Sequence, residues 1–340
     1  MGIREVAAAA GVSVTTVSHA LNGKGRLPQE TRDRVHEVAQ ELGYRPNATA
    51  RNLAGGKTGL LGLVISQPRE VRIALSDFAY FSYLTTAASA AALDRGYALV
   101  LTPSDMGLGA AVGVAVDGAI VVDPVEGDPL VEELRTASMP LVTTGRVVGD
   151  DAGRAWVDND HVAGTRSVLD HLARRGARRI ALMTTPTVIS YSVDVELAYR
   201  EWCTEHGMAP LITKADQELT ESAGYAAATK LLSGPTPPDA IFASYDRLAF
   251  GALLAAKARG VRVPDELLLA MTATESSRGK SSGPSVTAVT LHPDQIGQRA
   301  IELLIDIVEG RADGGEVLVP TAIIPRASTK RRVSGRGGQR

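Results

Sequence analysis

A single glycine between two short amphipathic segments constrains the fold of this chain more than any other feature. Residues 3–10 place their apolar side chains at i, i+3, i+4 and i+7, which predicts one buried face of a short helix. Gly11 follows, and glycine is the residue best able to adopt a positive φ and turn the chain sharply. Ser13 is a suitable N-cap for a second helix over residues 14–22. Two short helices joined by such a turn form the helix-turn-helix pattern.

The second predicted helix has an apolar face and a polar face. Its polar face carries Thr15, Ser18, His19 and Asn22. Hydroxyl, amide and imidazole groups at such a face can contact base edges and phosphates in a DNA major groove. An ordinary helical hairpin with a solvated polar face fits the same residues. Because these side chains suit base edges and phosphates, DNA binding is the favoured of the two interpretations at this point.

The residues that follow favour DNA binding further. Pro28 stands where a first-turn proline belongs, and residues 35–42 repeat the helical apolar spacing before Gly43 ends the run. This third helix can close a three-helix core. A fourth, very short helix is predicted from Asn47, with Leu53 on one side. Alone it is too short to be stable in water, so we expect it to order against a partner such as a DNA minor groove.

The run VAAAAGVSVTTVSHALNG and the later run TRDRVHEVAQELGYRPNATARNLAGGKTGLLGLV closely resemble the N-terminal region of the LacI/GalR family of bacterial transcription factors. The resemblance continues along nearly the whole chain. It implies a DNA-binding headpiece, a hinge helix whose Leu53 intercalates into the minor groove, and an effector-binding core of periplasmic-binding-protein type. By position, it implies DNA contacts at Val14, Thr15, Thr16, Ser18 and His19 of the second helix and at Leu53, beside Ala54, of the hinge. The candidate DNA-binding residues also include Asn22, Arg26, Thr31, Asn47 and Ala50.

From residue 60 onward, apolar runs of strand length alternate with helical segments. Examples are LLGLVIS at residues 60–66 and AIFASYD at residues 240–246. Continuously apolar strands separated by helices indicate parallel sheets that are buried on both faces. We expect two doubly wound α/β lobes joined by several crossings, with a ligand cleft between them at the carboxyl ends of the strands.

The predicted fold class is thus an all-α helix-turn-helix headpiece with a hinge helix, followed by a two-lobed α/β core with parallel sheets. The predicted domains are a headpiece over 1–46, a hinge helix and linker over 47–58, an effector-binding and dimerisation core over 59–326, and a basic disordered tail over 327–340.

The charge distribution is uneven although the net charge of the chain is only −2. Residues 1–60 hold 8 Lys and Arg against 5 Asp and Glu, and residues 326–340 hold 6 basic and no acidic residues. Basic ends suit phosphate, and the acidic remainder discourages non-specific wrapping of DNA. One cysteine, Cys203, excludes an internal disulfide, and no cofactor or metal site is predicted. No signal pattern or long apolar run is present, so we expect a cytoplasmic protein without membrane association.

The expected effector pocket departs from the family pattern. The resemblance implies ligand-holding Arg, Asn, Asp and Gln side chains at positions that here carry Ala198, Tyr245, Gly145, Ala273 with Thr274, and Leu291. A polyol site needs paired hydrogen-bonding groups, and most of them are lost. We expect that a simple hexose does not bind in the usual way. A less polar or aromatic-faced ligand, or none, is the alternative. The candidate effector-binding residues are Tyr191, Trp202, Tyr245, Asp246 and Ala273.

The sequence therefore predicts a non-enzymatic, sequence-specific DNA-binding transcriptional regulator, more in the manner of a repressor than of an activator. It is expected to bind a near-palindromic double-stranded operator as a homodimer, with its affinity modulated by a small molecule between the lobes. The alternative is a solute-binding receptor of periplasmic-binding-protein type, which the two lobes would fit and the N-terminal headpiece would not.

Overall fold

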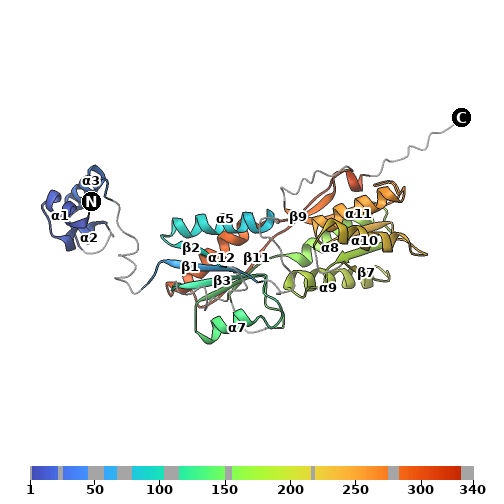
Figure 1. Cartoon of the computed structure of the whole chain (residues 1–340), viewed down its shortest axis with the longest axis horizontal. Coiled ribbons are helices and arrows are strands. Elements are labelled where there is room, and N and C mark those ends of the chain that lie inside the picture. The colour runs from blue at the N-terminus through green and yellow to red at the C-terminus, as the bar shows by residue number, and fades with distance from the viewer. Residues whose placement is uncertain are drawn as a thin grey trace. The chain divides into compact units, whose positions relative to one another are not determined.

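The chain divides into two compact units, residues 1–59 and residues 60–340, and each is described by itself (Figure 1). The structure, a computed structural model, describes residues 2–21, 26–44, 57–66, 79–102, 115–149, 155–215, 219–274 and 283–330.

The first unit contains the predicted pair of helices and the third helix that packs on them. Its helices are α1 (Ile3–Ala10), α2 (Val14–Leu21) and α3 (Gln29–Glu41), and each contacts the other two. Gly11 ends α1 in the left-handed conformation with φ of 66°, which confirms the turn expected there. Val6, Val17 and Val35, one from each helix, are fully buried at the centre of the small core.

The second unit begins with a lobe built on a six-stranded parallel sheet, called lobe 1. Its strand order is β11-β5-β4-β3-β1-β2, and every neighbouring pair is parallel. The strands are β1 (Leu60–Ile65), β2 (Ala98–Thr102), β3 (Gly118–Val122), β4 (Leu141–Thr144), β5 (Trp156–Asn159) and β11 (Glu316–Val319). Helices α5 (Ala79–Asp94) and α12 (Pro293–Val308) pack on one face, and α7 (Pro129–Thr136) packs on the other (Figure 1).

Lobe 2 repeats this architecture with the strand order β12-β10-β9-β8-β6-β7, in which only the β10–β12 pair is antiparallel. The strands are β6 (Ile180–Thr184), β7 (Leu211–Lys214), β8 (Ala240–Ala243), β9 (Leu268–Thr274), β10 (Thr287–Leu291) and β12 (Ala322–Ile324). Helices α8 (His161–Arg174) and α9 (Ser190–Glu205) share one core cluster with the sheet, and α10 (Glu221–Leu232) and α11 (Asp246–Ala258) share the other.

Within the described part of the chain, the backbone passes between the lobes three times. It crosses from β5 to α8, returns from β10 to α12, and crosses again between β11 and β12. The expectation of two doubly wound lobes joined by several crossings is therefore confirmed. The sequence did not reveal β5, β7 or β10, whose short segments carry several polar residues.

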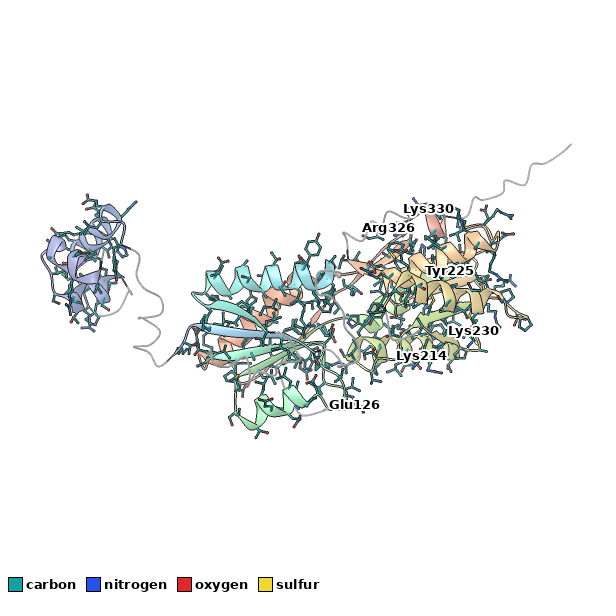
Figure 2. The ribbon with its side chains drawn as sticks, viewed as in Figure 1. Glu126, Lys214, Tyr225, Lys230, Arg326 and Lys330 are labelled. Atoms are coloured by element: carbon teal, nitrogen blue, oxygen red, sulfur yellow. The ribbon has the colours of Figure 1, made fainter. Side chains whose placement is uncertain are left out.

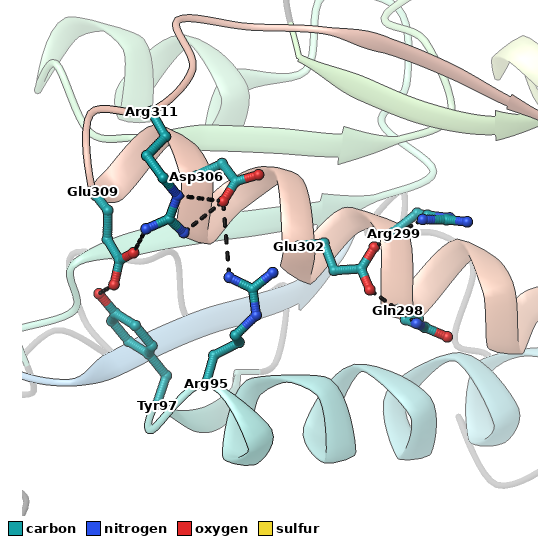
Figure 3. A network of polar contacts seen from close by, with 8 residues as sticks. All are labelled: Arg95, Tyr97, Gln298, Arg299, Glu302, Asp306, Glu309 and Arg311. Atoms are coloured by element: carbon teal, nitrogen blue, oxygen red, sulfur yellow. Dashed lines mark hydrogen bonds and ion pairs between the residues drawn. The ribbon is translucent and has the colours of Figure 1, made fainter.

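The return of α12 to lobe 1 is fixed by close packing and by a polar network. A Cβ on Gly297 would lie 2.2 Å from the carbonyl oxygen of Leu84, so α12 and α5 touch through their backbones there. At the far end of α12, the Tyr97 hydroxyl donates to Glu309 at 3.3 Å, and Arg311 Nε donates to Asp306 at 2.9 Å (Figure 3). These contacts therefore hold α12 on lobe 1.

The expected start of the disordered tail at residue 327 is wrong. Ala327–Thr329 form a 3-10 helix in which Ser328 and Thr329 are fully buried. Ser328 Oγ donates to the Leu269 carbonyl at 2.6 Å, which ties this turn to β9. The core therefore continues to Lys330, which flanks the turn on the surface of lobe 2 (Figure 2). Residues 331–340 of the expected tail lie outside the described residues.

Candidate DNA-binding and effector-binding sites

Helix α2 presents the face that the sequence assigned to DNA. Val14, Thr15 and His19 are exposed, whereas Val17 and Ala20 are buried against the other two helices. Thr15 and His19 are four residues apart and therefore neighbours on the helix surface. Among the described residues, none forms a hydrogen bond with the His19 ring, so the ring is available to a partner.

Ser13 fixes where α2 begins. The backbone N–H of Thr16 donates to Ser13 Oγ at 3.0 Å, and the two side-chain hydroxyls lie 2.8 Å apart. This is the N-cap that the sequence predicted. The Thr16 hydroxyl therefore already pairs with Ser13, and Thr16 as a whole is half-buried.

The other candidate DNA-binding residues lie in less regular places. Arg26 is exposed before α3, and Thr31 is half-buried in the first turn of α3, where its N–H donates to the Pro28 carbonyl. Ser18 is half-buried on α2. The candidates outside the described residues are Asn22, Asn47, Ala50, Leu53 and Ala54.

In the second unit, the carboxyl ends of the strands of both lobes bring polar and aromatic side chains together. This group is called the cleft cluster. Its members are Tyr80, Asp123, Asp158, Asn159, His161, Ser190, Tyr191 and Tyr245.

Asp158, at the end of β5, is the best-satisfied member of the cleft cluster. His161 Nε2 lies 2.9 Å from one carboxylate oxygen, and Ser190 Oγ donates to the other at 2.9 Å. Burial by itself raises the pKa of this carboxyl, but the charge of His161 and these hydrogen bonds outweigh it and hold the pKa below its ordinary value. Asp158 is therefore an ionised group that links lobe 1 to α8 and α9.

Asp123 has a different environment, directly after β3. Its φ is +49°, a left-handed conformation that is uncommon for a residue with a side chain and frequent at functional sites. Burial, followed by repulsion from Asp158, raises its carboxyl pKa from 3.8 to about 7, and His161 opposes this rise. Two nearby carboxyls thus have pKa values that their surroundings drive apart.

The cleft cluster contains three tyrosines, Tyr80, Tyr191 and Tyr245. The Tyr191 ring lies 4.6 Å from the His161 ring and 5.3 Å from the Tyr245 ring, measured between centroids. The Tyr191 hydroxyl donates to the Ser244 carbonyl at the end of β8. Burial, followed by repulsion from Asp123 and then Asp158, raises the pKa of Tyr80 well above its ordinary value. These hydroxyls therefore stay protonated and act as hydrogen-bonding groups.

The structure brings some of the expected effector residues together and leaves others apart. Tyr191 and Tyr245 pack against each other, and Asp246 is close enough to raise the pKa of Tyr191. Ala273 is buried in the core cluster of α10 and α11. Trp202 is 1% exposed in the opposite core cluster, and its indole N–H donates to Asp170 at 2.7 Å. The expectation that Trp202 joins the effector residues is therefore corrected.

Two positions at which the family pattern implies charged ligand contacts have structural explanations. Ala198 is fully buried, so it is a core position of α9. Asp194, one turn earlier on α9, reaches lobe 1 and pairs with Arg146 there. Gly145 has φ of +87°, and a Cβ there would lie 3.0 Å from Ser190 Oγ. An aspartate at Gly145 would therefore meet lobe 2.

A cavity of about 880 Å³ opens beside the cleft cluster. Asn159 and His161 line it, together with Arg146 and Asp194, and it extends along the face of β4, β5 and β11 that α7 leaves uncovered. A cavity of this size is typical of small-molecule sites. Tyr80, Asp123, Asp158 and His161 were missed as site residues, because only folding brings the ends of separate strands together. The Asp158–Asn159–Asp160 run before a helix was their one local signal.

Comparisons with known proteins agree with this architecture. The profile described as bacterial regulatory proteins, lacI family, matches residues 2–47, and that of a periplasmic binding protein-like domain matches residues 169–329. The chain is 30% identical over 315 residues to the HTH-type transcriptional regulator CelR of Thermobifida fusca, covering 90% of this chain and 91% of that protein. The chain belongs to the LacI family. It is a helix-turn-helix transcriptional regulator with a two-lobed core.

Other members of the LacI family match over similar lengths. The transcriptional repressor PurR of Escherichia coli strain ATCC 8739 is 30% identical over 341 residues, which cover 96% of each chain. A solved complex of the regulator CelR with cellobiose has a TM-score of 0.73 at 28% identity, covering 96% of this chain and 99% of that chain. The Lac repressor dimer bound to operator and an anti-inducer has a TM-score of 0.77 at 23% identity, covering 97% and 99%, and shows the shared fold.

Within the described ranges, no helix is long and apolar enough to cross a membrane. The same ranges contain no group of three His, Cys, Asp or Glu side chains that could hold a metal ion. Cys203 is buried as a free thiol, and burial raises its pKa, which keeps it in the unreactive thiol form.

Proposed function

We propose that this regulator represses transcription in the cytoplasm by binding a near-palindromic operator as a homodimer. The exposed face of α2 carries the proposal, because Thr15 and His19 point away from the three-helix core on a helix whose other face is fully used. A two-fold dimer presents two such helices to two half-sites, and such an arrangement requires a near-palindrome. The regulator acts by binding alone, with no catalytic step.

The residues divide by the kind of DNA contact that their chemistry permits. Thr15 and His19 read base edges in the major groove, helped by the methyl groups of Val14 and Thr16. Ser18, Arg26 and Thr31 contact phosphates and set the position of the helix. Leu53 is assigned to the minor groove as an apolar wedge, flanked by Ala50 and Ala54. Asn22 and Asn47 complete the set of polar contacts.

The effector is assigned to the space between the two lobes. Support comes from the cleft cluster, in which Asp123 and Tyr80 of lobe 1 face His161, Tyr191 and Tyr245 at the start of lobe 2 elements. A ligand that touches both lobes biases their closure and, through it, the affinity for DNA. The relative CelR was solved with cellobiose. For this chain we propose a ligand other than a simple hexose held in the usual family manner.

The experiment that tests operator recognition is a binding selection from random duplex DNA with purified full-length protein, followed by footprinting of the winning sequence. We expect a near-palindromic winner that is protected over two half-sites. Equal affinity for the winner and for a scrambled duplex at moderate salt, with and without ligands, would remove the proposal. A thermal-shift screen tests the effector: a large rise in Tm with a plain monosaccharide would contradict the proposed departure from hexose binding.

A further inference from the structure

We infer that the cleft takes a hydroxylated amine, whose protonated nitrogen pairs with the Asp123 carboxylate and whose hydroxyl oxygen accepts from the Asn159 amide. The inference rests on the proposed function, which places the effector between the lobes. It adds the charge and the chemical class of that effector. Four features of the cleft cluster carry it.

The first feature is the position of Asp123. Its N–H donates to the Thr144 carbonyl at 2.8 Å, which fixes a backbone with φ of +49°. Tyr80, Tyr245 and Asp158 are each close enough to this side chain to interact with it electrostatically. Among the described residues, none forms a hydrogen bond or an ion pair with the Asp123 carboxylate. Its acceptor oxygens are therefore left for a ligand.

The second feature is a buried amide with an unused donor. Asn159 is 1% exposed, and its Oδ1 accepts the His292 N–H at 3.2 Å. By the criteria of hydrogen-bond geometry its Nδ2 is fully buried without a partner. It lies near the Tyr80 hydroxyl, whose pKa is raised by burial and lowered by this amide. A buried donor without a partner costs about 1–3 kcal/mol, so a partner is expected in the functional state. The matching group on a ligand is an acceptor such as a hydroxyl oxygen.

The third feature is the sign of the local charge. Among the described residues beside the cleft cluster, Arg146 is paired with Asp194, and the His161 ring is hydrogen-bonded to Asp158. Closing the lobes over a neutral ligand would leave a desolvated carboxylate without a positive partner, which is costly. A ligand ammonium offsets this cost, and the faces of tyrosine rings also attract cations.

The fourth feature is access for a small molecule. Asn159 and His161 belong to the wall of the cavity of about 880 Å³, so the cluster borders open space rather than solid core. The Arg146–Asp194 pair also lines the cavity, and as an ion pair it adds no net charge to the wall. Asn159 and His161 therefore stand at one end of the cavity, with the Tyr191 ring against His161 and the Asp123 carboxyl close enough to His161 to interact with it electrostatically.

The test uses matched pairs of probes in which an ammonium group replaces one hydroxyl. The pairs are 1-amino-1-deoxy-D-sorbitol with D-sorbitol, and ethanolamine with ethylene glycol. Their binding to full-length protein is measured at about pH 8 by calorimetry and by the shift in Tm. We expect each amine to bind at least tenfold tighter than its neutral partner. Asp123→Asn, which keeps the size and tolerates a positive φ, should erase that difference.

The control is Asp265→Asn, which removes a carboxylate that is 50% exposed beside Arg262 and should leave the preference for amines unchanged. Equal binding of amines and polyols, retention of the preference in Asp123→Asn, or no response to any probe would overturn the inference. Operator binding is measured on the same samples. Intact operator binding without an amine response overturns only this inference, whereas loss of operator preference overturns the proposed function.

Discussion

Arg146, which follows β4 in lobe 1, forms an ion pair with Asp194 on α9 in lobe 2. The Asp194 side chain is only 13% exposed, and that of Arg146 is 42% exposed. The pair stands at the wall of the cavity and therefore reports on the distance between the lobes. This ion pair joins one residue of each lobe, so a ligand that changes the distance between the lobes would have to keep or break it.

The strength of the Arg146–Asp194 contact is measurable with a double-mutant cycle. We expect a coupling free energy of about 1 kcal/mol from urea unfolding of Arg146→Ala, Asp194→Ala and the double variant, because the aspartate is mostly buried. The pair Arg262–Glu266, with side chains 65% and 45% exposed, is the control and should couple more weakly. A coupling no larger than in the control would show that the interlobe pair contributes nothing.

His19→Ala should change which operator the protein prefers. His19 is exposed on the polar face of α2, and loss of one base-edge contact costs about 1–3 kcal/mol at one base-pair position. The measurement is a binding selection with variant and wild-type protein side by side. His36→Ala, on the exposed side of α3, should leave the preference unchanged. Identical preferred sequences for wild type and His19→Ala would contradict the role of His19.

Ser13→Ala should loosen the start of α2. The Thr16 N–H loses its acceptor at 3.0 Å, and loss of an N-cap costs about 1 kcal/mol. Hydrogen exchange of the full-length protein should show faster exchange in α2 and weaker operator binding, with unchanged protection in the second unit. Ser13→Asp supplies another capping acceptor and should restore protection. Unaltered exchange in Ser13→Ala would mean that packing alone sets the start of the helix.

Asp123 should make the protein less stable as the pH rises. Burial, then Asp158, raises its pKa from 3.8 to about 7, with His161 opposing, so between these values the folded protein holds a proton that the unfolded chain has released. The contribution of this group to the free energy of unfolding therefore falls toward pH 7 and is level above it. Asp123→Asn removes the effect.

The free energy of unfolding of Asp123→Asn, relative to that of the wild type, should increase by on the order of 1–3 kcal/mol from about pH 5 to pH 8. Urea unfolding across this range provides the measurement, with Asp265→Asn as a surface control. The groups that face Asp123, namely Tyr80, Asp158, His161 and Tyr245, are the same in all three proteins. A stability difference that is constant with pH would show that Asp123 titrates normally.

Gly145→Ala should destabilise the protein through two effects. Its φ of +87° disfavours a side chain, and a Cβ would lie 3.0 Å from Ser190 Oγ across the lobe boundary. Gly127, with φ of +64° and nothing within 4 Å of a Cβ, isolates the backbone effect. We expect Gly145→Ala to lower the Tm more than Gly127→Ala. Equal losses would indicate that Ser190 moves aside without cost.

The headpiece was predictable because its signals are local. Each signal acts on residues close to it in the sequence. The signals are the apolar spacing within residues 3–10, the turn at Gly11 and the N-cap at Ser13. The strand–helix alternation likewise predicted two lobes. Strands β5, β7 and β10 were missed because runs of four or five residues with several polar side chains carry no clear periodicity.

The cleft cluster was only partly predictable, because it is assembled from the ends of strands far apart in the sequence. Tyr191, Tyr245 and Asp246 were proposed from the resemblance and their chemistry, whereas Asp123 gave no local signal beyond its place after a strand. Trp202 was misplaced although the spacing was informative. Val195, Tyr199 and Trp202 follow each other at intervals of four and three residues, which is the core stripe of a helix, and all three are buried.

The last crossing between the lobes has a mechanical consequence. Strand β11 ends at Val319 in one sheet and β12 begins at Ala322 in the other, so only Pro320 and Thr321 separate them. So short a span reaches roughly 10 Å even when fully stretched, and Thr321 Oγ1 is further held by the Asp160 carbonyl at 3.2 Å. The sheet edges on this side cannot be drawn apart. Relative motion of the two lobes is then a rotation about the β11–β12 connection, and the largest displacement occurs at the sheet edges formed by β2 and β7.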